Sequence, residues 1–187
     1  MSFLFGGYRS AAVRAALKEW REHPQGRPAL YVQETLRPED LPWSGDWCGI
    51  YVLRSLQKAG LAKGVPWIIS EGFIWPLRLP RIATPLPGDI VVVPEPFQHQ
   101  ALVVEFEPVT GMVTSIDGNQ PDIRPRVRFI KNGNIQFYSI QPLIDAAERG
   151  FAWGAMLTGA ALLGAGAWIW LNGVPRPVER QLKRLGL

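Results

Sequence analysis

The only cysteine among the 187 residues, Cys48, stands where the chain is expected to start a helix. Residues 49–56 place apolar side chains at helical spacing, and Gly60 follows where a glycine commonly ends a helix. Ser44 and Asp46 come shortly before Cys48 and are candidates to cap the N-terminus. The pattern therefore predicts that Cys48 lies in the first helical turn.

A cysteine in a first helical turn is suited to nucleophilic chemistry. The unpaired N–H groups and the positive end of the helix dipole favour a thiolate over a thiol, and the thiolate is the nucleophile. Gly49 leaves space beside the sulfur of Cys48. The alternative is that Cys48 is a small buried hydrophobic residue, as cysteine often is.

A thiolate nucleophile needs a base, and the chain has two histidines. His23 precedes a proline in a turn, which favours a surface position. His99 follows a strand predicted over residues 90–93 and opens a second strand that includes residues 101–106. A histidine at the start of a central strand can face a helix N-terminus, so His99 is the candidate base. The alternative is a structural histidine at a strand end.

A third group is expected to orient the imidazole of His99. A strand followed by a polar cluster, at residues 112–119, supplies two candidates, Asp117 and Asn119. We expect Asn119 to contribute more than Asp117, because a neutral amide orients the ring without adding a buried charge. The alternative is ordinary turn chemistry, since Asp-Gly-Asn also forms turns.

In order and spacing, these segments resemble the CHAP-type cysteine amidohydrolases and peptidases of the NlpC/P60 and papain-like group. The resemblance covers about residues 30–140 and rests on four segments: Trp47-Cys48-Gly49, Pro87-Gly88-Asp89-Ile90, His99 with its following strand, and Ile116-Asp117-Gly118-Asn119. Two positions depart from the family pattern. Gln100-Ala101 stands where a small apolar pair is usual, and Asp117 stands where glutamate is frequent.

The resemblance implies an α+β, papain-like fold in which the nucleophile helix packs on a small antiparallel sheet. Cys48 matches the nucleophile, His99 the base, and Asp117 or Asn119 the third residue. Members of this family cleave amide bonds in peptidoglycan, and many belong to phages or are secreted bacterial effectors. The main domain is expected to span residues 1–148.

Composition excludes several other classes. The formal net charge is +4, with basic residues scattered or near the ends, which favours weak attraction to cell wall or lipid over nucleic-acid recognition. One cysteine excludes an internal disulfide, and two distant histidines argue against a metal centre. No glycine-rich phosphate loop is present. No cofactor is expected, because hydrolysis by a cysteine nucleophile needs none.

Outside the candidate catalytic segments, the sequence patterns predict helices, strands and loops. Val13, Ala16, Leu17 and Trp20 share one face of an amphipathic helix that starts at about Ser10 and ends at His23. Residues 24–46 are expected to be extended, and residues 61–87 form an aromatic-rich irregular stretch. An Asn-Gly turn predicts a hairpin between residues 127–130 and 135–140, and residues 142–149 are expected to form a short helix.

Residues 149–187 are expected to form a membrane anchor. Residues 151–171 carry no charge and span about 30 Å as a helix at roughly 1.5 Å per residue. Trp153 and Trp168 lie near the two ends, and small residues recur at helix-packing spacing. The alternative is a buried helix in a larger assembly, such as a homo-oligomer, a virion or a secretion machine.

The charges around this segment predict its orientation. Four basic residues follow the apolar stretch and only Arg149 lies just before it, so the C-terminus is expected in the cytoplasm and the catalytic domain on the cell-wall side. Because residues 1–7 lack the pattern of a signal peptide, delivery by a phage particle or secretion machine, or late insertion as a lysis protein, is expected.

The sequence therefore predicts a membrane-associated peptidoglycan hydrolase, either an endopeptidase or an N-acetylmuramoyl-L-alanine amidase. One alternative is a non-catalytic structural or membrane-interaction component of a phage tail or similar assembly. Another is a papain-like effector that acts on a host protein.

Overall fold

We analysed a computed structural model of the chain. It describes residues 5–36, 47–63, 65, 74, 77–94, 98–119, 122–130 and 134–150. The chain divides into two units, Met1–Asp145 and Ala146–Leu187. The first unit holds every helix and strand discussed below, apart from the last residues of a helix over 141–150.

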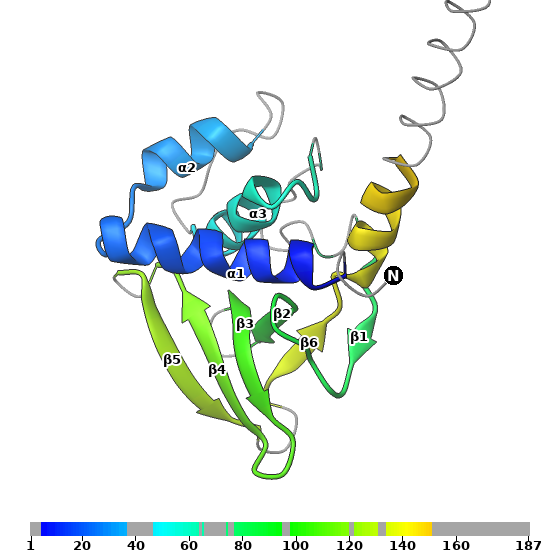
Figure 1. The fold of residues 1–187 in the computed structure, drawn as a ribbon. Coiled ribbons are helices and arrows are strands. Elements are labelled where there is room, and N and C mark those ends of the chain that lie inside the picture. The colour runs from blue at the N-terminus through cyan, green and yellow to red at the C-terminus, as the bar shows by residue number, and fades with distance from the viewer. Residues whose placement is uncertain are drawn as a thin grey trace, which may run out of the picture. The chain divides into compact units, whose positions relative to one another are not determined.

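The first unit has an α+β architecture, as expected, in which three helices come first in sequence, the strands follow, and the helix over 141–150 begins after the last strand (Figure 1). Its labelled helices are α1 (Phe5–Glu22), α2 (Pro28–Thr35) and α3 (Cys48–Lys58). Its strands are β1 (Arg81–Ile82), β2 (Ile90–Val93), β3 (His99–Glu107), β4 (Met112–Asp117), β5 (Arg124–Phe129) and β6 (Gln136–Tyr138). In Figure 1 the three helices gather on one side of the strands.

The six strands form one antiparallel sheet in the order β1-β6-β2-β3-β4-β5. The strands predicted over residues 90–93, 101–106 and 112–116 are confirmed as parts of β2, β3 and β4. The predicted hairpin is wrong, because β5 pairs with β4 and β6 pairs with β1 and β2. Phe137 of β6 pairs with Val91 and packs with it in an apolar cluster, and this burial outweighs the local turn preference of the Asn-Gly sequence.

Helix α3 is the most deeply buried helix, with Ile50, Val52, Leu53 and Leu56 fully inaccessible to solvent. It ends as the sequence predicted: Gly60 follows the last turn with a φ of 86°, a left-handed conformation that glycine adopts without steric cost. Tyr51 donates a hydrogen bond of 2.7 Å to the backbone oxygen of Ala16 in α1, which ties the two helices together.

Helix α1 begins earlier than predicted and buries a different face. Its buried side chains include Ala12, Ala16 and Glu19, whereas Val13, Leu17 and Trp20 of the expected apolar face are half-buried. The burial of the charged Glu19 was not predicted, and its partners explain it. Its carboxylate accepts hydrogen bonds from Arg27 at 2.8 Å, Tyr31 at 2.9 Å and Arg54 at 3.0 Å. One buried anion thus joins α1, α2 and α3.

Helix α2 lies inside the stretch that was predicted to be extended. Pro28 occupies the start of this helix, where the missing N–H costs nothing because no intrahelical partner exists there. Tyr31 is fully buried and packs against Trp47 and Tyr51, at ring-centroid distances of 5.6 and 6.0 Å. Tertiary burial of this tyrosine therefore overrides the weak local helix signal.

The turn before β2 is fastened by Asp89, which is 1% exposed. One carboxylate oxygen accepts from Arg9 of α1 at 2.6 Å and from the backbone N–H of Ile140 at 3.0 Å. The other oxygen accepts from the backbone N–H of Leu86 at 2.8 Å. Asp89, the last residue of the predicted Pro-Gly-Asp turn, thus connects the first helix, the sheet and the chain that follows β6.

Residues 141–150 are helical, in agreement with the predicted short helix. In the part of the chain that the structure describes, no helix is long and apolar enough to cross a membrane. The predicted C-terminal hydrophobic helix over 151–171 lies outside the described residues, and its assignment as a membrane anchor stays a prediction. The predicted domain boundary between residues 148 and 149 also stays a prediction.

Candidate active site

Cys48 is the first residue of α3, so the prediction that it lies in the first helical turn is confirmed. Trp47 occupies the N-cap position without a side-chain cap hydrogen bond, and Ser44 and Asp46 lie outside the described residues. The first backbone N–H groups of α3 have no partner within the helix, as at any helix start. Cys48 is 8% exposed.

Trp47 fixes the start of α3 against the end of β4. A side chain at Gly118 would place its Cβ 2.6 Å from the indole ring of Trp47, and one at Gly26 would also lie 2.6 Å from that ring. Real Cβ atoms do not approach so closely, so both glycines are needed for the indole to fit. Because Cys48 follows Trp47 directly, this packing also sets the position of the sulfur.

His99 and Asp117 are brought together by the register of β3 and β4. Ala101 pairs with Asp117, and strand alternation places His99 on the same face as Asp117. The two are diagonal neighbours, whose side chains can meet. Nε2 of His99 lies 2.8 Å from Oδ2 of Asp117, and both side chains are buried. Because an ionised carboxylate only accepts, Nε2–H is the donor.

His99 forms a hydrogen bond with Asp117, whereas the sequence argument ranked Asn119 first. The reason is geometric. β4 ends at Asp117, and Asn119 has a left-handed φ of 64°, so the strand register does not continue to it. Gly118 lies between them and takes the close contact with Trp47.

Cys48 interacts with His99 as well. The ring nitrogen that remains for the sulfur is Nδ1, because Nε2 is engaged by Asp117. Burial of the ring by itself would lower the pKa of His99. Hydrogen bonds with Asp117 and with Cys48 outweigh that effect and raise the pKa to about 9. The structure therefore brings together Cys48, His99 and Asp117 in a chain of side-chain contacts.

Asp117 is held from a second side by β5. Arg128 donates one hydrogen bond of 3.1 Å to Oδ1 and a second one to Oδ2, and it also donates to the hydroxyl of Ser115. Ser115 in turn donates to Oδ1 of Asp117 at 2.6 Å. Arg126 lies 3.7 Å from Oδ2. A fully buried carboxylate is thus satisfied by partners on three strands.

These partners decide the charge of Asp117. Burial alone would raise its pKa, but the hydrogen bonds from His99 and Arg128 and the charge of Arg128 hold the pKa well below its usual range. Asp117 is therefore ionised across the neutral range, and it favours the protonated form of His99. Sequence reasoning missed Arg128 and Ser115. The signal was present in β5, where arginine recurs at residues 124, 126 and 128, the period that sends side chains to one face of a strand.

His23, the other histidine, follows the last residue of α1 and takes part in a turn, with its backbone N–H bonded to Glu19. Within the described residues, no group of three or more His, Cys, Asp or Glu side chains is arranged to hold a metal ion. The chain of contacts from Cys48 to Asp117 is thus the grouping in the described part that has a nucleophile, a base and an orienting anion.

Comparison with protein-family models, with curated proteins and with solved structures finds no match to this chain. The resemblance to CHAP-type hydrolases therefore rests on the residues themselves and enters below as a proposal.

Proposed function

We propose that this protein is a cysteine hydrolase of amide bonds, with a papain-like CHAP fold and peptidoglycan as its substrate. The observation that carries the proposal is the contact chain from Cys48 through His99 to the buried Asp117. A helix-start cysteine next to a histidine that is oriented by a carboxylate is the arrangement that nucleophilic acyl transfer needs.

The proposed reaction gives each of these groups a role. Sγ of Cys48 attacks the amide carbonyl while Nδ1 of His99 holds the thiol proton. His99 then gives this proton to the leaving amine, and a thioester remains on Cys48. Water attacks the thioester with His99 as the base, and the acid is released. Asp117 keeps Nε2–H of His99 directed at its carboxylate throughout and stabilises the imidazolium.

The oxyanion of the tetrahedral intermediate needs hydrogen-bond donors. The start of α3 offers backbone N–H groups that the helix itself does not use, and they lie at the same helix end as Cys48. No cofactor enters this reaction.

Full-length protein incubated with purified peptidoglycan tests the proposal. We expect soluble fragments with new amino groups, detected by mass spectrometry, and a loss of roughly 10³-fold or more in Cys48→Ala and His99→Gln. His23→Gln is the matched control and should retain activity, because His23 lies in a turn at the end of α1. Absence of any Cys48-dependent product would favour a non-catalytic structural role instead. A host protein as substrate would be indicated by a reactive Cys48 that leaves peptidoglycan intact.

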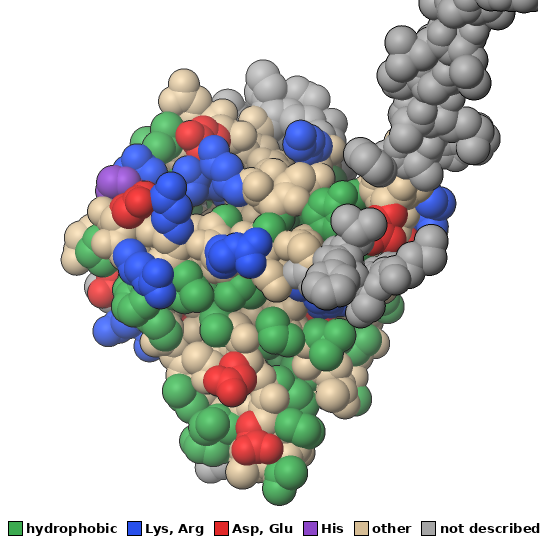
Figure 2. All heavy atoms as spheres, viewed as in Figure 1, with side chains coloured by type: hydrophobic (Ala, Val, Ile, Leu, Met, Phe, Trp, Pro, Cys, Tyr) green, Lys and Arg blue, Asp and Glu red, His purple; other side chains and the backbone are tan. Residues whose placement is uncertain are grey.

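We further propose that residues 151–171 anchor the protein in a membrane, with the catalytic unit on the cell-wall side or carried in a phage particle. The support is the uncharged stretch in the sequence and the basic residues that follow it. Figure 2 shows Lys and Arg side chains gathered over the helical part of the visible face, and Arg14, Lys18, Arg21 and Lys58 are exposed on α1 and α3. Such a surface suits an anionic wall or lipid.

A further inference from the structure

The face of the sheet that carries Asp117 also carries the three arginines of β5. Arg124 pairs with Asp117 and Arg126 pairs with Ser115, and the side chains of directly paired residues lie on the same face. Strand alternation adds Arg128 to this face. Asp117 therefore faces a row of positive charges from the neighbouring strand.

The three arginines differ in how they meet Asp117. Arg128 donates hydrogen bonds to both carboxylate oxygens, and its side chain is 17% exposed. Arg126 is 29% exposed and approaches Oδ2 only to 3.7 Å, which is longer than a hydrogen bond. Arg124 is directed to Asp122, at 3.1 Å. Arg128 thus holds Asp117 most closely, and Arg126 is a more distant cation.

One oxygen of Asp117 is shared between Arg128 and His99. Nε2 of His99 lies 2.8 Å from Oδ2, and Arg128 donates a hydrogen bond to the same atom. The carboxylate favours the protonated imidazole, whereas a guanidinium beside it disfavours that form, because like charges repel. Solvent screens buried charges only weakly. Arg128 therefore opposes the effect of Asp117 on His99.

The helix and the strand on the other sides of His99 contribute differently. Cys48 at the start of α3 bonds the ring and titrates with it. Tyr51 of the same helix stays neutral, because burial raises the pKa of its hydroxyl. Strand β2 consists of isoleucine and valine, and its Val93 pairs with His99.

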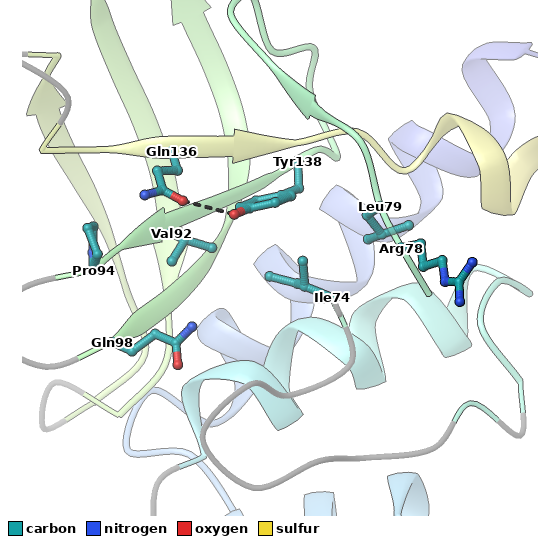
Figure 3. A pocket seen from close by; sticks show the side chains of 8 residues that line it. All are labelled: Ile74, Arg78, Leu79, Val92, Pro94, Gln98, Gln136 and Tyr138. Atoms are coloured by element: carbon teal, nitrogen blue, oxygen red, sulfur yellow. Dashed lines mark hydrogen bonds between the residues drawn. The ribbon is translucent and has the colours of Figure 1, made fainter. Parts of the chain in front are cut away.

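The chain just before His99 is also uncharged. Gln98 lines a cavity of about 720 Å³ together with Val92, which strand alternation places on the face opposite to His99 (Figure 3). Arg78 is the charged residue among the side chains drawn there, and its guanidinium is exposed and points away from the others. The residue of this cavity that adjoins His99 is thus a neutral amide.

The proposed reaction requires His99 to bind and to release a proton. The imidazole first takes the thiol proton of Cys48, and the imidazolium then gives it to the leaving amine. A buried carboxylate with no competing cation would hold the imidazolium so firmly that the second step would be slow. An intermediate proton affinity serves both steps.

On the basis of the proposed function, we propose that Arg128 is a positioning residue that limits the proton affinity of His99, with Arg126 adding a smaller effect in the same direction. Arg128 acts through Asp117 and not on the substrate. Ser115 fixes this arrangement, because its hydroxyl accepts a hydrogen bond from Arg128 and donates one to Oδ1 of Asp117.

NMR titration of the histidine rings tests the proposal without any substrate. The chain has two histidines, so the signal of His99 is assigned by comparison with His23→Gln. In a Cys48→Ala background the ring no longer titrates together with a thiol, and its pKa is read directly. We expect Arg128→Gln to raise the pKa of His99 by about one pH unit or more, a roughly tenfold gain in proton affinity, and Arg126→Gln to raise it by less.

Two further variants serve as controls. Arg128→Lys keeps the positive charge next to Asp117 and should reverse most of the shift seen in Arg128→Gln. Arg14→Gln, an exposed position on α1, should leave the pKa of His99 unchanged.

The direction of the shift decides the outcome. An unchanged or lowered pKa of His99 in Arg128→Gln would overturn the proposal, and so would a shift in Arg126→Gln as large as that in Arg128→Gln. If Arg128→Gln does not fold, the direction in Arg126→Gln decides, because a rise supports the proposal and an unchanged or lowered pKa overturns it.

The pH profile of hydrolysis gives a second measurement in protein that retains Cys48. Arg128→Gln should lower kcat/KM and move its alkaline limb to higher pH, because this limb reports the loss of the imidazolium proton. A lower kcat/KM with an unmoved limb would indicate a purely structural role and overturn the proposal. Absence of Cys48-dependent hydrolysis in the wild type would overturn the proposed function, whereas the NMR shift would still show that Arg128 limits the proton affinity of His99.

Discussion

At the scale of single residues, the site is organised around the shared charge of Asp117. Two cations compete for this carboxylate, the imidazolium of His99 and the guanidinium of Arg128. Arg128 and Ser115 keep the carboxylate ionised and hold it in place, so that one of its oxygens always faces His99. The orientation of the base therefore depends on β5, although the candidate nucleophile Cys48 lies on α3.

Replacing Asp117 should cost more activity than replacing Asn119. Asp117→Ala removes the acceptor for Nε2–H of His99, and we expect the rate of hydrolysis to fall by about 10²-fold or more. Asn119→Gly removes the amide while preserving the left-handed backbone at this position. Rates are compared for variants whose circular dichroism shows an intact fold. A larger loss of activity in Asn119→Gly than in Asp117→Ala would show that the side-chain amide of Asn119 orients His99.

The paired charges of His99 and Asp117 also predict a pH dependence of stability. The folded pKa of His99, about 9, lies above its ordinary 6.5, so its contribution is complete below 6.5 and is lost as the pH rises through 9. The folded pKa of Asp117 is lowered from 3.8, so its contribution is present above 3.8 and is lost as the pH falls below that value. The pair therefore stabilises the fold most between these limits.

Urea unfolding of wild type and His99→Gln measures this contribution. The difference in the free energy of unfolding between the two proteins should be largest near about pH 5.5 and should shrink by about pH 10. A difference that grows with increasing pH through 9 would mean that His99 is neutral in the folded protein.

At the scale of elements, the catalytic geometry depends on how α3 meets the sheet. The helix start is fixed by Trp47, which occupies the space left by Gly26 and Gly118 and packs against Tyr51 at a centroid distance of 6.2 Å. His99 is fixed separately by the pairing of β3 with β4. Gly118 belongs to the chain just after β4, so it connects the two arrangements.

Gly118→Ala should therefore affect stability and activity together. The added Cβ would lie 2.6 Å from the Trp47 ring, and we expect overpacking to cost about 1–3 kcal/mol in the free energy of unfolding. Displacement of Trp47 moves Cys48 away from His99, so alkylation of Cys48 by iodoacetamide should also lose its dependence on His99. Gly7→Ala is the control, because a Cβ there meets nothing within 4 Å and alanine favours a helix. An unchanged free energy of unfolding in Gly118→Ala would show that the packing of Trp47 against Gly118 does not fix the start of α3.

At the scale of the whole first unit, two buried carboxylates join parts that are distant in sequence. Asp89 connects α1 with the turn before β2 and with the chain after β6. Glu19 connects the three helices, and Arg54, one of its partners, also bonds Glu34 at 2.7 Å and lies 4.9 Å over the Tyr31 ring. The helices are thus held to one another by charge as well as by apolar contacts.

Glu19→Gln should destabilise the unit strongly. It leaves the buried guanidinium of Arg54 without its α1 partner, and breaking such a pair costs about 3 kcal/mol or more. The midpoint of urea unfolding should fall accordingly. Glu22→Gln is the matched control on the same helix, because its contact with Lys18 is exposed and 3.8 Å long, and exposed pairs contribute little. Equal effects of the two substitutions would show that the Glu19 network is not structural.

The sequence by itself determined the elements whose signals are local. The spacing of apolar residues before Gly60 predicted α3 and placed Cys48 at its start, and runs of β-branched residues predicted β2 and β3 with His99 at the strand opening. These patterns arise within one element, where a period of 3.6 or 2 reports which side is buried. The α+β class followed from the order of these elements.

Only the tertiary structure decided which of these elements meet, because strand pairing and burial join residues that no local pattern relates. In the tertiary structure β6 pairs with β2 and not with β5, because the burial of Phe137 outweighs the turn preference of the Asn-Gly sequence. It formed α2 in a proline-bearing stretch around the buried Tyr31. The tertiary structure also pairs His99 with Asp117, because β4 ends at Asp117 and the left-handed backbone of Asn119 interrupts the strand register.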